Sequence, residues 1–224
     1  MKATHNTKPA MTAARVRKVL QKHGFLMLSD ATLPSVSGLV AGEPIKGSWW
    51  GHPAGHAIYN ISNALLNHPD VLVTRLIGGK VTMLDRRLWA AFFAVATEGA
   101  AWQTTKLSAG ATKLLAAVKR NGEIRSDAIP SALGLDAKAF AAAARDLERR
   151  LLLTSEDVHT ERGSHAKILR SWKVWRESLT GDTPAPMSDV AEARAMLETA
   201  VQGAMPAASE GVSLPSLPWL KRRP

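Results

Sequence analysis

The sequence lacks cysteine in all 224 of its residues. This absence excludes disulfide bonds, thiolate zinc sites and cysteine nucleophiles, so a metal site would have to use histidine, aspartate or glutamate. Long hydrophobic runs are also missing, because no apolar stretch approaches the roughly 18 residues of a membrane span and the N-terminus has no apolar signal core. We therefore expect a cytoplasmic protein with no membrane partner.

Several catalytic motifs are missing as well. The chain contains no G-x-S-x-G, no G-x-x-x-x-G-K-[ST], no G-x-G-x-x-G and no H-E-x-x-H. These patterns are typical of serine hydrolases, phosphate-binding loops, dinucleotide-binding folds and zinc peptidases. Their absence argues against hydrolases and nucleotide-dependent enzymes, and we expect no cofactor and no metal.

Acidic residues are unevenly distributed. Residues 1–23 hold six lysines and arginines and no acid, in a chain whose formal net charge is +10. Residues 43–176 are also basic, residues 177–220 are acidic, and the last four residues contain three basic side chains. A basic body favours a polyanionic ligand, since each neutralised phosphate releases condensed counterions. We expect double-stranded DNA as the partner and a nucleoid-associated location; the alternative is that the charge serves solubility alone.

The second half of the chain predicts one compact unit over residues 105–179. A helix over 107–120 opens with Ser108 as its N-cap and ends at Asn121-Gly122. An extended EIRSD, a short helix in AIPSALGL and a third helix from Asp136 to about Arg150 follow. LLLTSEDVHT and HAKILRSW then predict two strands around the turn ERGS. Helix, strand, helix, helix and hairpin is the order of a winged helix, whose third helix enters the major groove.

The first half repeats this order over residues 12–104 with an insertion rich in glycine, tryptophan and histidine. The pattern predicts helices over 12–22, 33–40 and 53–67 and an extended segment FLML. Gly78-Gly79 then lies between two strand-like runs, which is a hairpin signal. The fold class that we expect is mainly α with small β-hairpins, arranged as tandem winged-helix modules joined by a helix over 87–97.

The two ends of the chain differ from this body. Residues 1–11 read as a basic N-terminal arm. Residues 180–224 read as a linker, an acidic helix over 189–201 and a basic tail rich in proline and serine. The final LPWLKRRP combines apolar and basic residues, which fits a docking peptide for a protein partner, an extra phosphate clamp, or a tail without fixed structure.

The stretch GSWWGHPAGH (47–56) gathers two tryptophans, two histidines, three glycines and a proline. Pro53 suits the first position of the third helix, which predicts His52 as the N-cap. The free N–H groups at such a helix start, with Lys46 beside them, would suit a phosphate.

Three uses of this stretch remain open. Trp49 or Trp50 could insert into a base stack with Tyr59 as a further DNA contact, and Lys46, His52 and His56 are then the candidate catalytic groups for acid–base or amine chemistry. His52 and His56 have the helical spacing of two metal ligands, with His159, Glu161 or His165 as a third. Alternatively the tryptophans fill an interface between modules, a use that applies more strongly to Trp89, Trp102, Trp172 and Trp175.

Further DNA contacts are expected on the third helix of the second module and on both hairpins. These candidates are Arg86, Arg87, Lys138, Arg145, Arg149, Arg162, His165 and Lys167. Each has an ordinary structural alternative: a solvated helix face for the helical residues, an ion pair with Asp85 for the two arginines beside it, and a structural histidine pair in the second hairpin.

Two segments carry a family resemblance. HTERGSHAKILRSWKVW (159–175) and KVTMLDRRLW (80–89) resemble the bacterial winged-helix DNA glycosylases that remove alkylated or crosslinked bases, and the likeness spans residues 12–176. That family has a Gln-x-Gln or Gln-x-Asp catalytic pair, whereas Gln103 here is followed by two threonines. The resemblance therefore implies duplex DNA, including damaged DNA, as the ligand and does not carry over the chemistry.

Three functional classes follow from these features. The first is recognition of damaged or distorted DNA in repair, with glycosylase or abasic-site lyase activity at the GSWW stretch if the protein is a metal-independent enzyme. The second is a transcription regulator, in which Lys138, Arg145 and Arg149 read bases. The third is a protein-interaction adaptor that uses the tail and the acidic helix.

Overall fold

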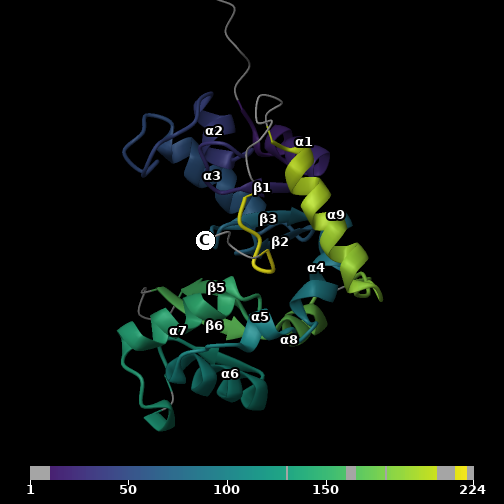
Figure 1. The fold of residues 1–224 in the computed structure, drawn as a ribbon. Helices are drawn as coiled ribbons and strands as arrows, with labels where there is room; N and C mark the ends of the chain where they lie inside the picture. The colour runs from purple at the N-terminus through teal and green to yellow at the C-terminus, as the bar shows by residue number, and fades with distance from the viewer. Residues whose placement is uncertain (1–10, 130, 160–164, 180, 206–214, 221–224) are drawn as a thin grey trace, which may run out of the picture.

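The computed structural model describes residues 11–129, 131–159, 165–179, 181–205 and 215–220. This part of the chain mixes helices with two small antiparallel sheets, each of three strands. One order of elements occurs twice, and Figure 1 shows the two resulting modules one above the other. The first module consists of α1 (Ala13–His23), β1 (Phe25–Met27), α2 (Val36–Ala41), α3 (Gly55–Leu66), β2 (Val71–Thr74) and β3 (Thr82–Asp85).

The second module repeats the series with a 3-10 helix in the second helical position. It consists of α6 (Ala109–Asn121), β4 (Glu123–Arg125), η2 (Ser131–Leu133), α7 (Ala137–Arg149), β5 (Thr154–His159) and β6 (His165–Arg170). The remaining elements link or cover the modules: η1 (Arg86–Leu88), α4 (Trp89–Ala96), α5 (Ala101–Thr104), α8 (Trp172–Glu177) and α9 (Val190–Gly203).

Local chemistry fixes where the longer helices begin and end. The predicted cap Ser108 is confirmed, since its hydroxyl accepts from the backbone N–H of Ala111 at 3.1 Å. Asp136 caps α7 in the same way through Ala139 at 2.7 Å. α1 and α6 both end at a glycine with positive φ, Gly24 at 83° and Gly122 at 81°, a conformation that glycine adopts without steric cost.

The first sheet, with strand order β1-β3-β2, is buried on both faces. Leu26 pairs with Met83, and both lie in the apolar cluster formed with α1 and α3. Their neighbour Phe25 belongs to a second cluster, on the side of α4 and α9, because successive strand residues point to opposite faces. The sheet is thus the middle layer between two helical layers.

The second sheet, with strand order β4-β6-β5, carries a network of ion pairs. Ile124 and Leu169 face the apolar cluster of α6 and α7. Arg170 bridges the neighbouring strands, binding Glu123 at 2.8 Å and Glu156 at 3.0 Å.

A buried aromatic cluster joins the modules. The Trp172 ring lies 4.7 Å from Phe92, and the Trp175 ring lies 5.8 Å from Trp89. Trp89 and Trp172 are buried and Trp102 and Trp175 partly buried. The interpretation of these four tryptophans as interface fillers is therefore confirmed. α9 packs along α4 beside α1, as Figure 1 shows.

Residues 215–220, which we name the C-terminal strap, pack into this joint. Leu217 is fully buried, and the Ser216 carbonyl accepts from the backbone N–H of Gly78 at 2.8 Å. The Trp219 indole N–H donates to Glu198 on α9 at 2.6 Å. The part of the expected docking peptide at 217–220 therefore packs against its own chain; residues 221–224 lie outside the described residues.

Several predicted boundaries were wrong. α3 begins at Gly55 rather than Pro53, and its N-cap position is Ala54, not His52. In the first hairpin, Thr74 pairs with Thr82, so seven residues separate the strands instead of the Gly78-Gly79 turn alone. The strand expected over HAKILRSW ends at Arg170 because Ser171 caps α8, accepting from the backbone N–H of Val174 at 3.3 Å.

Within the described ranges, we find no helix whose length and apolar character would let it cross a membrane.

Candidate nucleic-acid interface

The loop between α2 and α3 folds back tightly on the start of α3. The carbonyl of Trp49 accepts from His52 N at 3.1 Å, and the carbonyl of His52 accepts from Gly55 N at 2.7 Å. A Cβ on Gly55 would lie 3.0 Å from the Trp49 carbonyl oxygen and 3.1 Å from that of Trp50. The absence of a side chain at position 55 thus lets the two tryptophans sit at the helix start.

This fold-back presents an aromatic stack to solvent. The rings of Trp49 and Trp50 lie 4.3 Å apart with 23° between their planes, and Tyr59 on α3 lies 5.6 Å from Trp50. Trp50 is 66% exposed and Tyr59 is 43% exposed. The stack therefore differs from the buried tryptophans of the joint, and its outer ring can accept a base or another flat group.

The three candidate catalytic residues are close in sequence but do not form a joint constellation. His52 accepts from Ala54 N through Nδ1 at 3.1 Å, and its Nε2 lies 3.8 Å from Glu43. His56 Nδ1 lies 3.2 Å from the side-chain nitrogen of Asn60. Lys46 is exposed and makes no ion pair with any described residue. Within the described chain, no hydrogen bond or ion pair joins any two of the three.

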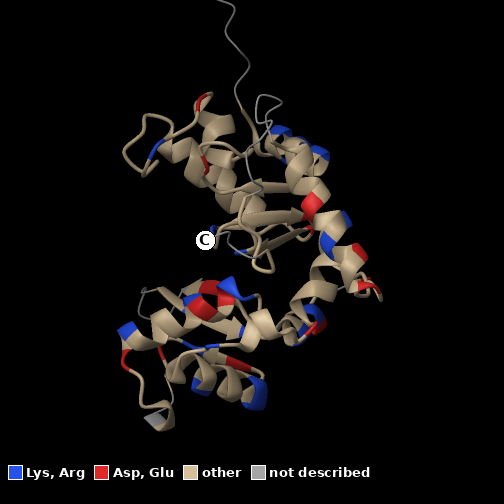
Figure 2. Ribbon diagram, viewed as in Figure 1, with Lys and Arg blue, Asp and Glu red and all other residues tan. Residues whose placement is uncertain are grey.

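The exposed face of α3 carries no formal charge. The whole stretch 47–69 contains no Lys, Arg, Asp or Glu, in a chain that is 21% charged (Figure 2). His56, Tyr59 and Asn60 are exposed and Asn63 is half-buried. His56, Asn60, Asn63 and Asn67 follow one another at intervals of three or four residues, so they form one stripe.

The exposed face of α7 is basic. Lys138, Arg145 and Arg149 are exposed and are separated by the small residues Ala141 and Ala142. The two acids of the helix are held in ion pairs, Asp146 with Arg150 at 2.9 Å and Glu148 with Arg75 at 2.9 Å. Lys138, Arg145 and Arg149 therefore lie on a face where the acids within the helix are already neutralised.

The third helices of the two modules match residue for residue at a separation of 82 positions. The buried Ile58 and Leu65 of α3 correspond to the buried Phe140 and Leu147 of α7. On the exposed stripe, His56, Asn60, Asn63 and Asn67 correspond to Lys138, Ala142, Arg145 and Arg149. The two helices thus present different chemistry from equivalent places.

The remaining predicted contacts are mostly engaged within the chain. Arg86 lies 3.7 Å from Asp70 and 5.4 Å from the centre of the Trp89 ring, while Arg87 donates to the Lys22 carbonyl at 2.9 Å. Lys167 pairs with Asp157 at 3.1 Å. Arg149 packs on Gly79 of the first hairpin. His165 is exposed, and Arg162 lies outside the described residues.

A small cavity of about 180 Å³ lies between the modules. Thr74 and Arg75 line it from the first module, and Glu148, Ser155 and Lys167 line it from the second. Glu148 pairs with Arg75 across the joint and also accepts from the Ser155 hydroxyl. The charged groups of the cavity thus neutralise one another and hold the two modules together.

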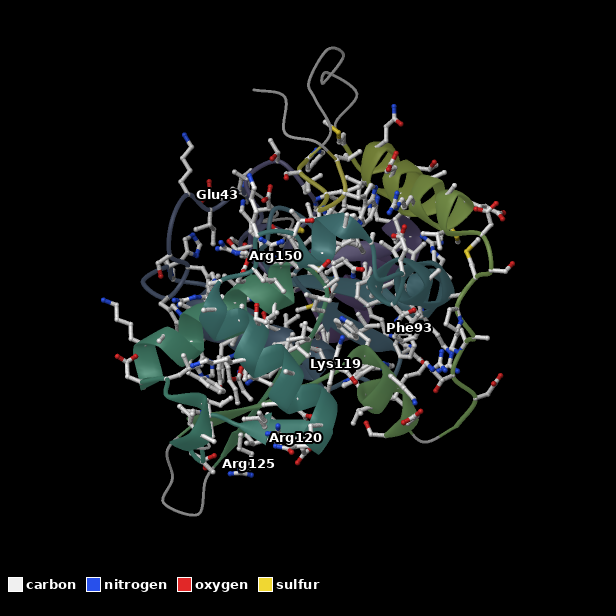
Figure 3. The ribbon with its side chains drawn as sticks, turned by 60° about the horizontal axis from the view of Figure 1, so that its bottom comes forward. Glu43, Phe93, Lys119, Arg120, Arg125 and Arg150 are labelled. Carbon is white, nitrogen blue, oxygen red and sulfur yellow. The ribbon has the colours of Figure 1, made fainter. Side chains whose placement is uncertain are left out.

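Some functional candidates escaped the sequence analysis. Asn60 and Asn63 become visible only when the exposed face of α3 is known, although the charge-free stretch 47–69 could have marked them. In the view of Figure 3, Arg120 of α6 lies near Arg125 of β4, and Lys119 lies further from Arg125. Two of them sit in the last turn of α6, where cations favour the helix dipole, so their presence has a structural explanation.

In the described part of the chain, His, Asp and Glu side chains form no group of three or more that could hold a metal ion. His165 therefore does not gather with His52 and His56 as a third ligand, whereas Glu161 and the His159 side chain lie outside the described residues. No protein-family model, curated protein or solved structure matches this chain.

Proposed function

We propose that this chain is a duplex-DNA-binding protein built from two winged-helix modules, and that it recognises damaged or distorted DNA. The observation that carries the proposal is the pair of equivalent third helices: α3 contains no acid, and both acids within α7 are held in ion pairs. In winged helices the third helix enters the major groove, where an acidic side chain would be repelled by the phosphates on both sides.

The arrangement of the modules supports a shared ligand. In the view of Figure 1, α3 and α7 both lie to the left of α4, α8 and α9. The element order and the strand orders β1-β3-β2 and β4-β6-β5 are those expected of winged helices. One duplex could therefore contact both modules, with the basic face of α7 supplying affinity that depends on salt.

The preference for distorted DNA rests on the aromatic stack. Stacking of a base on an aromatic ring is worth about 1–3 kcal/mol, and unstacking costs least at a damaged or mismatched base. Trp50, with 66% of its surface exposed and with Trp49 behind it, can fill the gap that a missing or displaced base leaves.

Binding to short labelled duplexes that are intact, contain one abasic site or carry one alkylated base tests this proposal. We expect binding to all three, with the highest affinity for a damaged duplex and a steep fall in affinity as salt rises. Trp50→Ala should abolish the preference, whereas Trp50→Phe should keep most of it. Failure to bind any duplex at low salt would overturn the DNA-binding proposal, and equal affinity for all three would overturn the damage preference alone.

The enzymatic form of the proposal concerns Lys46. This exposed amine makes no ion pair with a described residue and lies on the loop that carries Trp50. A lysine amine can condense with the aldehyde of an abasic sugar, releasing water and forming an imine. Borohydride would reduce that imine to a stable adduct, so trapping and strand cleavage that both disappear in Lys46→Ala would establish lyase chemistry. Binding without trapping or strand cleavage would mean that the protein binds damaged DNA but has no lyase activity.

A transcription regulator is the second candidate, and the asparagine stripe of α3 is the observation that favours it. Amide side chains read base edges, which an intact recognition sequence presents. A regulator also usually dimerises to match a palindromic site. Sequence-selective binding by a dimer, with no preference for damage, would favour this function over the first.

A further inference from the structure

We propose that the two modules divide the work of recognition: the first reads adenine in the major groove through Asn60 and Asn63, and the second holds the phosphate backbone through Lys138 and Arg145. This inference rests on the proposed binding of duplex DNA and adds to it the bases that are read and the residues that read them.

The equivalence of the third helices supports this division. Asn63 of α3 occupies the position that Arg145 occupies in α7, and His56 the position of Lys138. α3 thus offers neutral hydrogen-bonding groups at the positions where α7 offers cations. Neutral amides gain little from a phosphate but match base edges, whereas lysine and arginine gain most from a phosphate.

Asparagine has the donor and acceptor pair that adenine requires. Adenine presents N7 as an acceptor and its N6 amine as a donor in the major groove, and one asparagine amide can bind both at once. Residues 47–69 contain no Lys, Arg, Asp or Glu, so no charged side chain of this stretch competes for these amides. A stripe of amides on an uncharged helix face is therefore suited to A·T pairs.

His56 orients the amide of Asn60. The Asn60 side-chain nitrogen lies 3.2 Å from His56 Nδ1. When that ring nitrogen accepts one amide hydrogen, the second hydrogen and the amide oxygen stay free, which is the pair that adenine N7 and N6 need. In the tautomer whose Nδ1 accepts, His56 is thus a positioning residue that fixes which way the amide faces.

Asn63 supplies a second reader almost one turn further along α3. It is half-buried, and its side chain makes no hydrogen bond within the described chain. A separation of three residues corresponds to about 4.5 Å along a helix, so the two amides can reach neighbouring base pairs. Asn67, the last of the stripe, is already committed, because its amide nitrogen donates to the Asn63 carbonyl at 2.8 Å.

The partners of α7 explain why the second module suits the backbone. Its acids are tied to Arg75 and Arg150, so Lys138 and Arg145 face solvent with only alanines between them. Alanine side chains are short and allow close approach to the duplex. Contacts of this kind set affinity and its salt dependence without selecting a sequence.

Two measurements on the full chain test the division. Selection from a pool of duplexes with a randomised centre first gives the preferred site, which we expect to contain A·T pairs at fixed positions. The adenines of that site are then replaced one at a time by 7-deazaadenine, which pairs normally but lacks the N7 acceptor. We expect one or two replacements to weaken wild-type binding by about tenfold, and the same replacements to have no effect on the Asn60→Ala,Asn63→Ala variant.

Arg145→Ala is the matched control, because it lies at the position equivalent to Asn63. It should weaken binding to every duplex by a similar factor, lower the slope of log affinity against log salt by about one, and keep the full effect of 7-deazaadenine. Melting temperatures check that each variant is folded, and the exposed positions make large losses unexpected.

The outcomes separate the two proposals. If no duplex binds, DNA binding itself fails. If duplexes bind but 7-deazaadenine leaves wild-type affinity unchanged at every position, or if Arg145→Ala rather than the asparagine variant removes its effect, the division of roles is overturned while DNA binding stands.

Discussion

Gly55 is the residue on which the geometry of the candidate site depends most directly. It begins α3, and in a helix interior alanine is favoured over glycine by about 0.5–1 kcal/mol. Here a Cβ would lie 3.0 Å from the Trp49 carbonyl oxygen, so the helix gain competes with displacement of the loop.

For Gly55→Ala we expect a melting temperature close to that of the wild type together with a loss of affinity for damaged duplexes, because the aromatic stack moves. Gly203→Ala is the matched control, since a Cβ there meets no atom within 4 Å and should stabilise α9 without changing DNA binding. Unchanged duplex affinity in Gly55→Ala would show that the position of the stack does not matter.

Asp30 gives the molecule a sensitivity to acid. Burial opposes its ionisation, but hydrogen bonds from Lys80 and from the Leu33 and Thr32 backbone outweigh that effect and lower the pKa of Asp30 to about 2. A carboxylate with a lowered pKa stabilises the fold above its ordinary value near 3.8, and this contribution disappears as the pH falls from there through about 2.

The melting temperature should therefore fall over this interval, and Asp30→Asn should flatten that part of the curve while lowering stability at neutral pH. Lys80→Met removes one of the partners and should produce a smaller change of the same kind. An Asp30→Asn curve parallel to the wild type from neutral to acid pH would contradict this assignment.

Individual residues were predictable where one local interaction decides them. Ser108 and the turn at Gly122 follow from capping preferences that need no tertiary context. His52 was wrong as an N-cap because two tight turns, closed by the Trp49 and His52 carbonyls, precede the helix. Trp89 was the stronger candidate for burial in the sequence, but the exposure of Trp50 stayed open there, since it depends on which elements pack over the side chain.

At the scale of elements, the C-terminal strap shows how a short segment without regular structure can stabilise its neighbours. Its Leu217 enters the same apolar cluster as α4 and α9, and its Ser216 binds the turn of the first hairpin. Removal of a buried leucine side chain costs about 2–5 kcal/mol through lost burial and the cavity left behind.

Leu217→Ala should therefore lower the melting temperature clearly, whereas Leu220→Ala, at a partly buried position, should lower it less. Thermal unfolding followed by circular dichroism compares the two. Equal and small effects would mean that the strap adds nothing to the stability of the joint.

The order of elements was largely visible in the sequence, and the strap was not. Apolar periodicity and capping residues located α1, α6, α7 and α9 to within a few residues. The strap has no period, and its composition of proline, serine, leucine and tryptophan is equally compatible with a free tail. Only the apolar cluster into which Leu217 packs distinguishes a packed strap from a free tail.

At the scale of the whole molecule, the relation between the modules depends on the ion pair of Arg75 and Glu148. Glu148 keeps 9% of its side-chain surface exposed and Arg75 keeps 28%. Loss of one partner from a buried pair leaves an uncompensated charge, which typically costs about 3–5 kcal/mol, with the lower end expected here because Arg75 retains contact with water.

Glu148→Ala should destabilise the chain, and Arg75→Met,Glu148→Met should recover most of the loss, because two apolar side chains of similar size leave no unpaired charge. Urea unfolding of the three variants measures both effects. A double variant as unstable as Glu148→Ala would indicate that the joint requires the ion pair itself.

The packing of the two modules against each other was the part of the fold that could not be predicted from the sequence. Arg75 and Glu148 are 73 positions apart, and nothing in either helix or hairpin pattern pairs them. The candidate site was partly predictable, because its tryptophans and histidines stand out in composition. The readers proposed on α3 emerge only when its exposed face is compared with that of α7.

The burial of Leu217 has a consequence for the way the protein is made. During translation the first module can form its own cluster around α1 and α3 early, since all of those residues leave the ribosome first. The cluster around α4 also needs Leu151, Trp172, α9 and Leu217, so it stays open until the strap has been synthesised. The apolar cluster around α4 is therefore completed only after the strap has been synthesised, later than the cluster around α1 and α3.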